Sequence, residues 1–409
     1  AGEQIEVCDA AGAVIQTVRY RDDWYRITDG AGFSLTAQNP RGTNAWNHRD
    51  AWRPSAVAGG SPGFDDAGLV PAPGAIVINE LLANSSGGVS DWIELHNTTD
   101  EPVDVGGWFV SDSANDLTRY EIAQGTTIAP RGYLVLTEDQ HFGNEGDPGC
   151  HRAFGLSRSG ETVYLHSGSS GVLTGYSEAA AFGPSESGVT FGHHRISTGA
   201  SHFVAMSQPT PGQGNAYPQV GPIVITEIMY NPGLSQHAEY VELLNLGDSD
   251  VVFYDFEREA PWRFSNDPDH PSVEFLFPDD PPVTLSPKRY LVLTKDRAAL
   301  ARAYSVGAYA QVLQWGPGLL DNATGTIQLS APGDLRDDGQ REWICLERVR
   351  YSDGSRHEDF PAGRDPWPAG ADGLGLSLSR TRADRYSDDP NNWQGATPLV
   401  GAARGRYAP

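Results

Sequence analysis

The sequence predicts an all-β protein built from tandem β-sandwich modules, and three observations lead to this fold class. Short segments rich in Ile, Val, Tyr and Trp alternate with Asn, Gly, Pro and Asp, which is typical of strands joined by turns. The same segments recur in the same order further along the chain, as expected for an array of similar modules. Gly (47) and Pro (29) are abundant while 39% of the residues are hydrophobic, which favours many short strands over disorder.

The recurrence defines the expected domain organisation. Three segments of one copy, Ile76–Glu80, Asp91–Asn97 and Gly132–Thr137, correspond to Ile223–Glu227, Glu239–Asn245 and Arg289–Thr294 in the next copy. Two later signatures extend the pattern back to the start of the chain: Gly2–Val7 matches Gly160–Leu165 and Gly325–Leu329, and Asp29–Leu35 matches Asp372–Leu378. We therefore expect the C-terminal half of a module at residues 1–68, a full module at 75–217, and a full module with loop insertions at 221–405.

The incomplete first module predicts a surface that associates with other β-structure. Without the strands of a first half, residues 1–68 would expose the inner face of a sheet and unpaired strand edges, which proteins seldom leave uncovered. We expect residues 3–36 to pair with strands from elsewhere. The donor would be a severed N-terminal part retained non-covalently, another subunit, or the neighbouring module.

Alternation within the repeated strands predicts how each one is buried. In Asp91–Asn97, Ile93 and Leu95 point to one face while Trp92 and Glu94 point to the other. Antiparallel strands of this kind, without a βαβ rhythm, pack as two sheets. One stretch is helical by its spacing of apolar residues, namely 295–304.

The charge of the chain excludes some partners. The formal net charge is −24, with 53 acidic against 29 basic residues, so nucleic acid and an anionic membrane surface are poor partners. No run approaches the ~20 apolar residues of a membrane-spanning helix, so we expect no membrane insertion.

The three cysteines, Cys8, Cys150 and Cys345, fall at non-equivalent places, since Cys8 matches His166 and Ser330. A disulfide belonging to the module is thereby excluded, whereas free thiols and one bridge between modules both stay open.

The repeated residues resemble the lamin tail domain as it occurs in large exported bacterial proteins. The shared features are Ile-Val-Ile-(Asn/Thr)-Glu, then (Asp/Glu)-(Trp/Tyr)-(Ile/Val)-Glu-Leu-x-Asn, then Tyr-Leu-Val-Leu, and later Asp-Gly-x-Gly-x-Ser-Leu. The resemblance runs through nearly the whole chain, with gaps in the loops. It implies immunoglobulin-like β-sandwiches and a non-catalytic role in binding or scaffolding. The second copy degrades the Asp-Gly signature, and the third carries extra sequence at 261–287 and 296–318.

One acidic pair is repeated: Glu80 and Glu94 correspond to Glu227 and Glu242. Two carboxylates are the machinery of glycoside hydrolysis, but a pair present in both copies more often holds loops by hydrogen bonds. Zinc-ligand spacing and a phosphate-binding glycine loop are absent from the sequence. We therefore expect no catalytic residues and no enzyme activity.

Other residues are candidates for binding. Oxygen-rich loops suit Ca²⁺, which takes six to eight oxygen ligands, and the candidate ligands are Asp112, Asp116, Asp139, Glu145 and Asp147. Most of the ten Trp lie in segments that define the module and are expected in the core. Three lie in loops of the third copy, which makes them the freer candidates for a binding surface: Trp262, Trp315 and Trp367. The glycosylation acceptor pattern occurs at Asn84, Asn97 and Asn322.

Together these observations predict a non-catalytic adhesion or scaffolding segment of a larger surface or secreted protein. Its location would be extracellular or at the cell surface. Its partners would be other protein chains or the N-terminal part of its precursor, with Ca²⁺ as an optional aid. The alternative is a carbohydrate-binding accessory array of an exported enzyme, with polysaccharide as the ligand. A hydrolase with its site between modules is a third reading.

Overall fold

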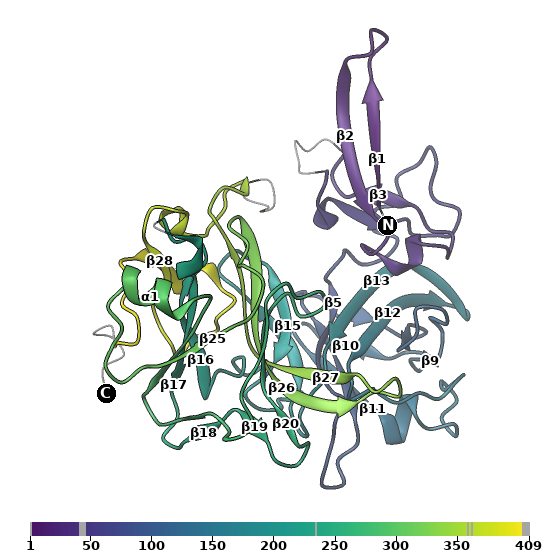
Figure 1. Cartoon of the computed structure of the whole chain (residues 1–409). Coiled ribbons are helices and arrows are strands. Elements are labelled where there is room, and N and C mark those ends of the chain that lie inside the picture. Colours follow the sequence, from purple (N-terminus) through teal and green to yellow (C-terminus); the bar gives the residue numbers. More distant parts are fainter. Residues whose placement is uncertain (1, 41–45, 234, 358–359, 361–362, 403–409) are drawn as a thin grey trace. The chain divides into compact units, whose positions relative to one another are not determined.

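A computed structural model describes residues 2–40, 46–233, 235–357, 360 and 363–402. Nearly all regular structure in this part of the chain is antiparallel β-sheet (Figure 1), which confirms the predicted fold class. The chain divides into two compact units. The first holds residues up to 182 with 186–193 and 203–216, and the second holds 183–185, 194–202 and the residues from 217 onward. None of the described helices is long and apolar enough to span a membrane.

The second module consists of two sheets with a shared core. One sheet has the strand order β11–β6–β5–β14–β15, with bounds β5 (Ile76–Leu82), β6 (Trp92–Asn97), β11 (Tyr133–Thr137), β14 (Phe191–Arg195) and β15 (Ser201–Ala205). The other has the order β13–β12–β8–β9, with bounds β8 (Phe109–Ser111), β9 (Tyr120–Glu121), β12 (Glu161–Ser169) and β13 (Val172–Phe182). A two-stranded pair joins β7 (Val103–Asp104) to β10 (Thr127–Ile128).

The core of this module contains the residues that alternation selects. Ile93 and Leu95 of β6 are fully buried in it together with Val163 and Leu165 of β12. Trp92 and Glu94, on the other face of β6, are buried too. Both faces of this strand are therefore covered, which period-two alternation does not reveal.

The second compact unit repeats the architecture. Its larger sheet has the order β25–β24–β17–β16–β28–β29, with bounds β16 (Ile223–Met229), β17 (Tyr240–Asn245), β24 (Tyr290–Thr294), β25 (Gln311–Gln314), β28 (Ser377–Arg380) and β29 (Trp393–Ala396). Its smaller sheet has the order β22–β21–β26–β27, with bounds β21 (Arg263–Asn266), β22 (Glu274–Leu276), β26 (Thr324–Leu335) and β27 (Arg341–Ser352). Short pairs join β18 (Val251–Val252) to β23 (Thr284–Leu285) and β19 (Tyr254–Asp255) to β20 (Ala260–Pro261).

The extra sequence at 296–318 of the third copy packs on the outer face of its larger sheet. The expected helix is present as α1 (Arg297–Ala303), and the Asp296 side chain caps it by accepting a hydrogen bond from the Ala299 N–H at 2.9 Å. Leu300 of this helix packs with Tyr240 and other outer-face residues in a second hydrophobic cluster. The chain after the helix returns as β25, which pairs parallel to β24. Single turns of 3₁₀ or π helix occur at Arg26–Thr28, Arg49–Ala51, Glu138–Phe142, Gln236–Ala238, Ala369–Ala371 and Pro390–Asn392.

The first 69 residues carry two separate strand pairs. β1 (Gly2–Cys8) pairs with β2 (Val14–Arg21), and β3 (Leu35–Ala37) pairs with β4 (Trp52–Pro54). Within the described chain, neither β1 nor β2 has a second neighbouring strand (Figure 1), so the neighbouring module does not supply the expected donor strand.

Four large apolar residues of this segment differ in their exposure. Ile5, Val7 and Ile15 are exposed, whereas Phe33 is buried. Phe33 packs with Ile27 against Leu117 of the second module, in a small cluster that lies within the first compact unit. The loop after β2 is therefore packed against the second module, whereas the apolar side chains of the β1–β2 hairpin are exposed.

Candidate functional site

The repeated acidic pair of the second module lies side by side on β5 and β6, next to a bulge in β5. Both Glu80 and Glu94 are fully buried. Glu80 accepts hydrogen bonds from the Thr190 hydroxyl (2.6 Å) and from the Thr210 hydroxyl (2.7 Å) and N–H. Glu94 accepts from the Asn79 side-chain amide at 2.7 Å and from the Gly212 N–H. All four carboxylate oxygens thus have donors from the protein itself.

The third copy uses its acidic pair in the same way. Glu227 accepts from the Ser377 hydroxyl and from the Leu399 N–H at 3.2 Å. Glu242 accepts from the Thr226 hydroxyl at 2.7 Å and from the Gly401 N–H at 2.6 Å. In each copy, two carboxylates hold backbone N–H groups that lie two residues apart near the end of the module.

These carboxylates anchor the segment that closes each module, residues 209–212 in the second copy and 397–401 in the third. Burial raises the pKa of Glu94, and the Gly212 and Asn79 donors oppose that rise by stabilising the charged form. The carboxylate oxygens of Glu80 and Glu94 are therefore engaged in hydrogen bonds within the module. The arrangement supports the anchoring interpretation of the pair. Sequence reasoning did not identify the donors Thr190, Thr210 and Ser377, although Ser377 is the Ser of the Asp-Gly-x-Gly-x-Ser-Leu signature.

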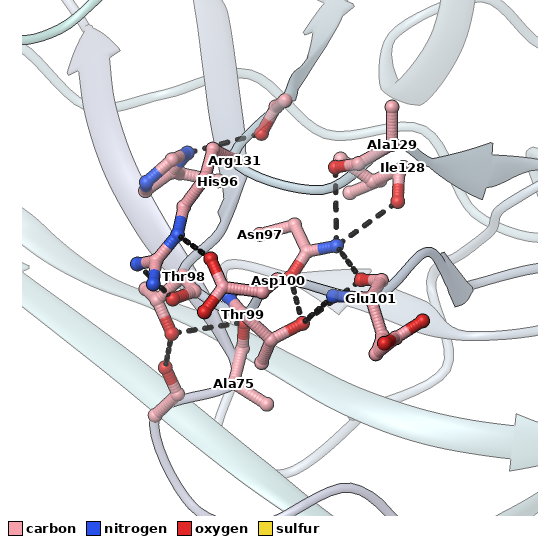
Figure 2. Close-up of polar contacts among 12 residues, drawn as sticks. Ala75, His96, Asn97, Thr98, Thr99, Asp100, Glu101, Ile128, Ala129 and Arg131 are labelled. Atoms are coloured by element: carbon pink, nitrogen blue, oxygen red, sulfur yellow. Dashed lines mark hydrogen bonds and ion pairs between the residues drawn. The ribbon is translucent and has the colours of Figure 1, made fainter.

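A second repeated residue, the Asn that ends the motif, organises the turn after its strand (Figure 2). The Asn97 side-chain nitrogen lies within hydrogen-bonding distance of the carbonyls of Glu101 (2.7 Å), Ile128 (3.0 Å) and Ala129 (3.1 Å). Its side-chain oxygen accepts from the Thr99 N–H (2.9 Å) and hydroxyl (2.7 Å). Because Asn97 is fully buried and its nitrogen is occupied, the acceptor pattern at this position does not mark a glycosylation site.

Asn245 repeats this arrangement in the third copy. Its side-chain nitrogen donates to the carbonyls of Ser249 (2.9 Å) and Leu285 (2.8 Å), and its oxygen accepts from the Gly247 N–H (2.8 Å). The repeated Asn is therefore a turn-organising residue in both copies.

The calcium candidates near β8 face arginine. The Asp112 carboxylate forms an ion pair with Arg119 at 2.6 Å, and Asp116 lies 3.8 Å from the same guanidinium and 3.6 Å from that of Arg152. Arginine thus supplies the positive charge that a bound cation would bring.

The remaining calcium candidates are spread along one loop. Asp147 accepts the Gly149 N–H at 2.7 Å in a local turn, and Asp139 and Glu145 are exposed. Among the described residues, no three His, Cys, Asp or Glu side chains come together as a metal site. Calcium binding through these loops stays a prediction that this arrangement does not favour.

The three loop tryptophans that were predicted to form a binding surface all pack in or against the core of the third copy. Trp315 and Trp367 are buried in the main core of the third copy, and Trp262 is partly buried against it. Trp262 and Trp315 belong to the extra sequence of the third copy, whereas Trp367 lies in the segment between β27 and β28. Trp92, Trp108 and Trp393 are buried as expected.

The cysteines are all free thiols, so the structure has no bridge between modules. Cys8 is exposed on β1, whereas Cys150 and Cys345 are partly buried. Cys8 is thereby the most accessible of the three thiols.

A comparison with models of known protein families matches one segment of this chain, residues 70–179. No curated protein matches the chain. This segment lies within the second module and runs from the residues before β5 to within β13. The match supports a β-sandwich fold and a non-enzymatic role in protein interaction. Residues 70–179 match the family model of the lamin tail domain.

Proposed function

We propose that this chain is a non-catalytic adhesion or scaffolding segment of a larger exported protein, and that its modules act by binding other protein chains. The tandem lamin-tail-like copies at 75–217 and 221–405, and the half module at 1–68, are part of this proposal. The location would be extracellular or at the cell surface.

The proposal rests on the hydrogen bonds that the repeated acidic pairs accept. The Glu pair repeated in both full copies uses its carboxylate oxygens to accept hydrogen bonds from the closing segments and from neighbouring hydroxyls. This removes the best candidate for hydrolysis from both copies. What the modules then offer to a partner is their surface.

Composition supports a protein partner over nucleic acid or lipid. The net charge of −24 opposes binding to either polyanionic surface. Exposed large apolar side chains are concentrated at the start of the chain, where seven of them lie among the first 69 residues: Ile5, Val7, Val14, Ile15, Val57, Phe64 and Leu69. Clustered exposed apolar residues are typical of protein interaction sites.

The carbohydrate-binding alternative has less support. Sugar recognition would use exposed aromatic faces, but the candidate tryptophans contribute to the core or lie partly buried against it. Exposed aromatics such as Tyr309 and Phe256 occur singly along the sequence. We therefore rank protein binding first.

The test is binding of the fluorescently labelled full chain to intact cells of its source. One cell sample is treated with protease to remove surface proteins, and a second is treated with periodate to oxidise surface sugars. We expect binding to untreated cells that protease removes and periodate leaves intact. Loss after periodate alone would establish the carbohydrate alternative, and absence of binding to all three samples would contradict the proposal.

A further inference from the structure

Two strands of the chain have the same five residues but different surroundings. β11 and β24 both read Tyr-Leu-Val-Leu-Thr. Each pairs antiparallel with the strand that carries a repeated Glu, and the central Val lies opposite that Glu in both copies. All five residues of β24 are buried, whereas in β11 only Leu136 is buried and the other four are half-buried. Identical strands in the same register are therefore covered to different extents.

The additional cover of β24 is the strand β25. It lies parallel to β24 and places Val312 opposite Val292 and Leu313 opposite Leu293. Val312 packs against the cluster on the outer face of the sheet, and Leu313 packs against the main core. Within the described chain β11 pairs with β6 alone, so it is an edge strand. The third copy thus shows how a parallel strand completes this edge.

The edge is open in the second copy because of the segment that follows β11. In the third copy the chain after β24 forms α1 and then returns along β24 as β25. In the second copy β11 is followed directly by the helical turn Glu138–Phe142, and the next strand, β12, belongs to the other sheet. The open edge therefore results from an internal connection of the module.

The β11–β6 ladder determines which backbone groups of β11 point outward. The Asn97 N–H donates to the Gly132 carbonyl at 3.0 Å. Because bonding alternates along an antiparallel strand, three residues of β11 turn their backbone groups away from β6: Tyr133, Val135 and Thr137. The Thr137 N–H donates to His141 Nδ1 at 3.0 Å. The N–H groups of Tyr133 and Val135 and the carbonyls of all three residues are thus directed at the open side.

The third copy also shows which donors an added strand uses. The Trp315 N–H, immediately after β25, donates to the Thr294 carbonyl at 3.0 Å. Since the N–H groups of a strand alternate in direction, the Leu313 N–H faces β24 as well, whereas the Gln314 N–H faces away. In the same register on β11, the N–H that corresponds to Leu313 would donate to the Val135 carbonyl.

The charge at the end of the open edge differs between the copies. Glu138 and Asp139 follow β11, where Lys295 and Asp296 follow β24. Burial raises the pKa of Glu138, and the neighbouring carboxylates of Asp91 and Asp139 raise it further. A parallel strand brings its C-terminal end to these carboxylates. A basic residue at that end of the ligand is therefore favoured.

We propose that the open edge of β11 binds an extended segment of a partner protein, which adds parallel to β11 as β25 adds to β24. The segment has two adjacent aliphatic residues, one for each face of the sheet, with polar residues on both sides and a basic residue after them. Backbone hydrogen bonds provide affinity in such strand addition, and side chains provide specificity. This deepens the proposed function and rests on it only in taking the ligand to be protein.

The test uses the full chain and a fluorescent synthetic peptide of residues 308–316 with Trp315→Lys. This probe keeps the β25 sequence and places a basic residue next to Glu138. Two further probes carry one backbone N-methyl group each, on Leu313 or on Gln314. Fluorescence anisotropy measures their affinities. We expect the Leu313 methyl to weaken binding by at least about tenfold and the Gln314 methyl by less than about threefold, because only the first replaces a donor that faces β11.

Hydrogen exchange of the full chain identifies the site of binding. The unmethylated probe should slow exchange within residues 133–137, where the N–H groups of Tyr133 and Val135 become bonded. Residues 290–294 have the same sequence and serve as the internal control. Their exchange should not change, because β25 is part of the same chain and occupies that edge at a high effective concentration.

A charge substitution tests the preferred chemistry of the partner. A peptide with Trp315→Glu should bind at least about threefold more weakly than the Trp315→Lys peptide. Asp139→Lys in the full chain should remove most of this preference, since it reverses a charge at the end of β11. Asp337→Lys, which changes an exposed residue of the third copy, should preserve it.

Three results would overturn the proposal: no binding of the unmethylated peptide, equal losses from the two methyl groups, or unchanged exchange within residues 133–137. Protection of those residues that rises with protein concentration without any peptide would also overturn it, since a second copy of the chain would then be the occupant. Saturating peptide should compete with binding of the chain to cells. Cell binding that persists under saturating peptide would refute the role of this edge and leave the proposed function in place, whereas peptide binding by a chain that binds no cells would contradict the proposed function alone.

Discussion

Arg380 and Glu347 form an ion pair that is removed from solvent, with side-chain exposures of 0% and 3%. The guanidinium also donates to the Ile225 carbonyl at 2.9 Å, and the carboxylate accepts the Ile225 N–H at 3.2 Å. The pair thus bonds both backbone groups of Ile225 on β16, immediately before the bulge in that strand. Burial raises the pKa of Glu347, and Arg380 opposes that rise.

Breaking this pair from one side should destabilise the second compact unit strongly. Arg380→Met leaves a buried carboxylate without its counter-charge, and we expect a loss of about 3–5 kcal/mol in the free energy of unfolding. Denaturant titration measures the loss. The exposed pair of Arg382 and Asp384 provides the control, since Arg382→Met should change stability by less than about 1 kcal/mol. Equal effects of the two substitutions would contradict the assignment.

The anchoring role of the acidic pairs predicts local opening of the closing segment. Glu80→Ala leaves the donors of Thr190 and Thr210 without their acceptor, at about 1–3 kcal/mol for each buried donor. Hydrogen exchange of residues 209–212 should accelerate, and that segment should become sensitive to protease. Glu101→Ala, which removes an exposed carboxylate, is the control. If the closing segment stays protected in Glu80→Ala, the carboxylate is not its anchor.

The hydrogen bonds of Asn97 predict that Asn97→Asp lowers stability, whereas the same change at an exposed Asn does not. Asn97→Asp replaces a donor that faces three carbonyls by a carboxylate, which repels them in a buried site. We expect at least about 2–3 kcal/mol of destabilisation, measured as a lower melting temperature. Asn115→Asp, at an exposed position, should melt like the parent chain. A comparable melting temperature for both variants would show that the Asn97 network contributes little.

Acid should destabilise the first compact unit through His166. Burial lowers the pKa of this side chain from 6.5 to about 4, with a further contribution from nearby Arg26. The folded state therefore keeps His166 neutral while the unfolded chain binds a proton below pH 6.5. Stability is fully present above pH 6.5 and falls as the pH is lowered towards 4, by up to about 1.4 kcal/mol per pH unit.

The comparison of urea unfolding at pH 7 and pH 5 measures this dependence. His166→Ser, the residue that the third copy carries as Ser330, should reduce it by about 1–2 kcal/mol. His193 and His202 are half-buried, and desolvation also lowers their pKa values to about 4, so they account for part of what remains. His237→Ser, at an exposed position, should leave the dependence unchanged. The same pH dependence in His166→Ser and the parent would refute the role of His166.

Local patterns were sufficient for the strands and for much of the core. Alternation placed Ile93 and Leu95 on the buried face, because successive side chains of a strand point to opposite sides whatever its surroundings. The helix was predictable in the same way, since the spacing of apolar residues before Tyr304 repeats with the helical period. The repeated Glu pair could be recognised as structural because both copies have it.

What covers the second face of each sheet was not predictable. Trp92 and Glu94 are buried because the closing segment returns over β6, and Tyr240 is buried because α1 does the same over β17. Trp315 lies in a loop, as expected, but its side chain is part of the core because distant residues pack around it. In each case the covering residues are far away in the sequence, so that no local period encodes the contact.

By itself, the sequence determined the all-β class, the order of the strands and the repeated Glu and Asn positions, because these depend on periodicity and on side chains within a few residues. Only the tertiary structure decided which of those side chains are saturated with hydrogen bonds, which loop aromatics enter the core, and which strands lack a neighbour. Those properties depend on contacts between segments a hundred or more residues apart, such as the bond from Thr210 to Glu80. Long-range contacts of this kind form only when the chain is packed, and they are the reason that the repeated acidic pair anchors the closing segments.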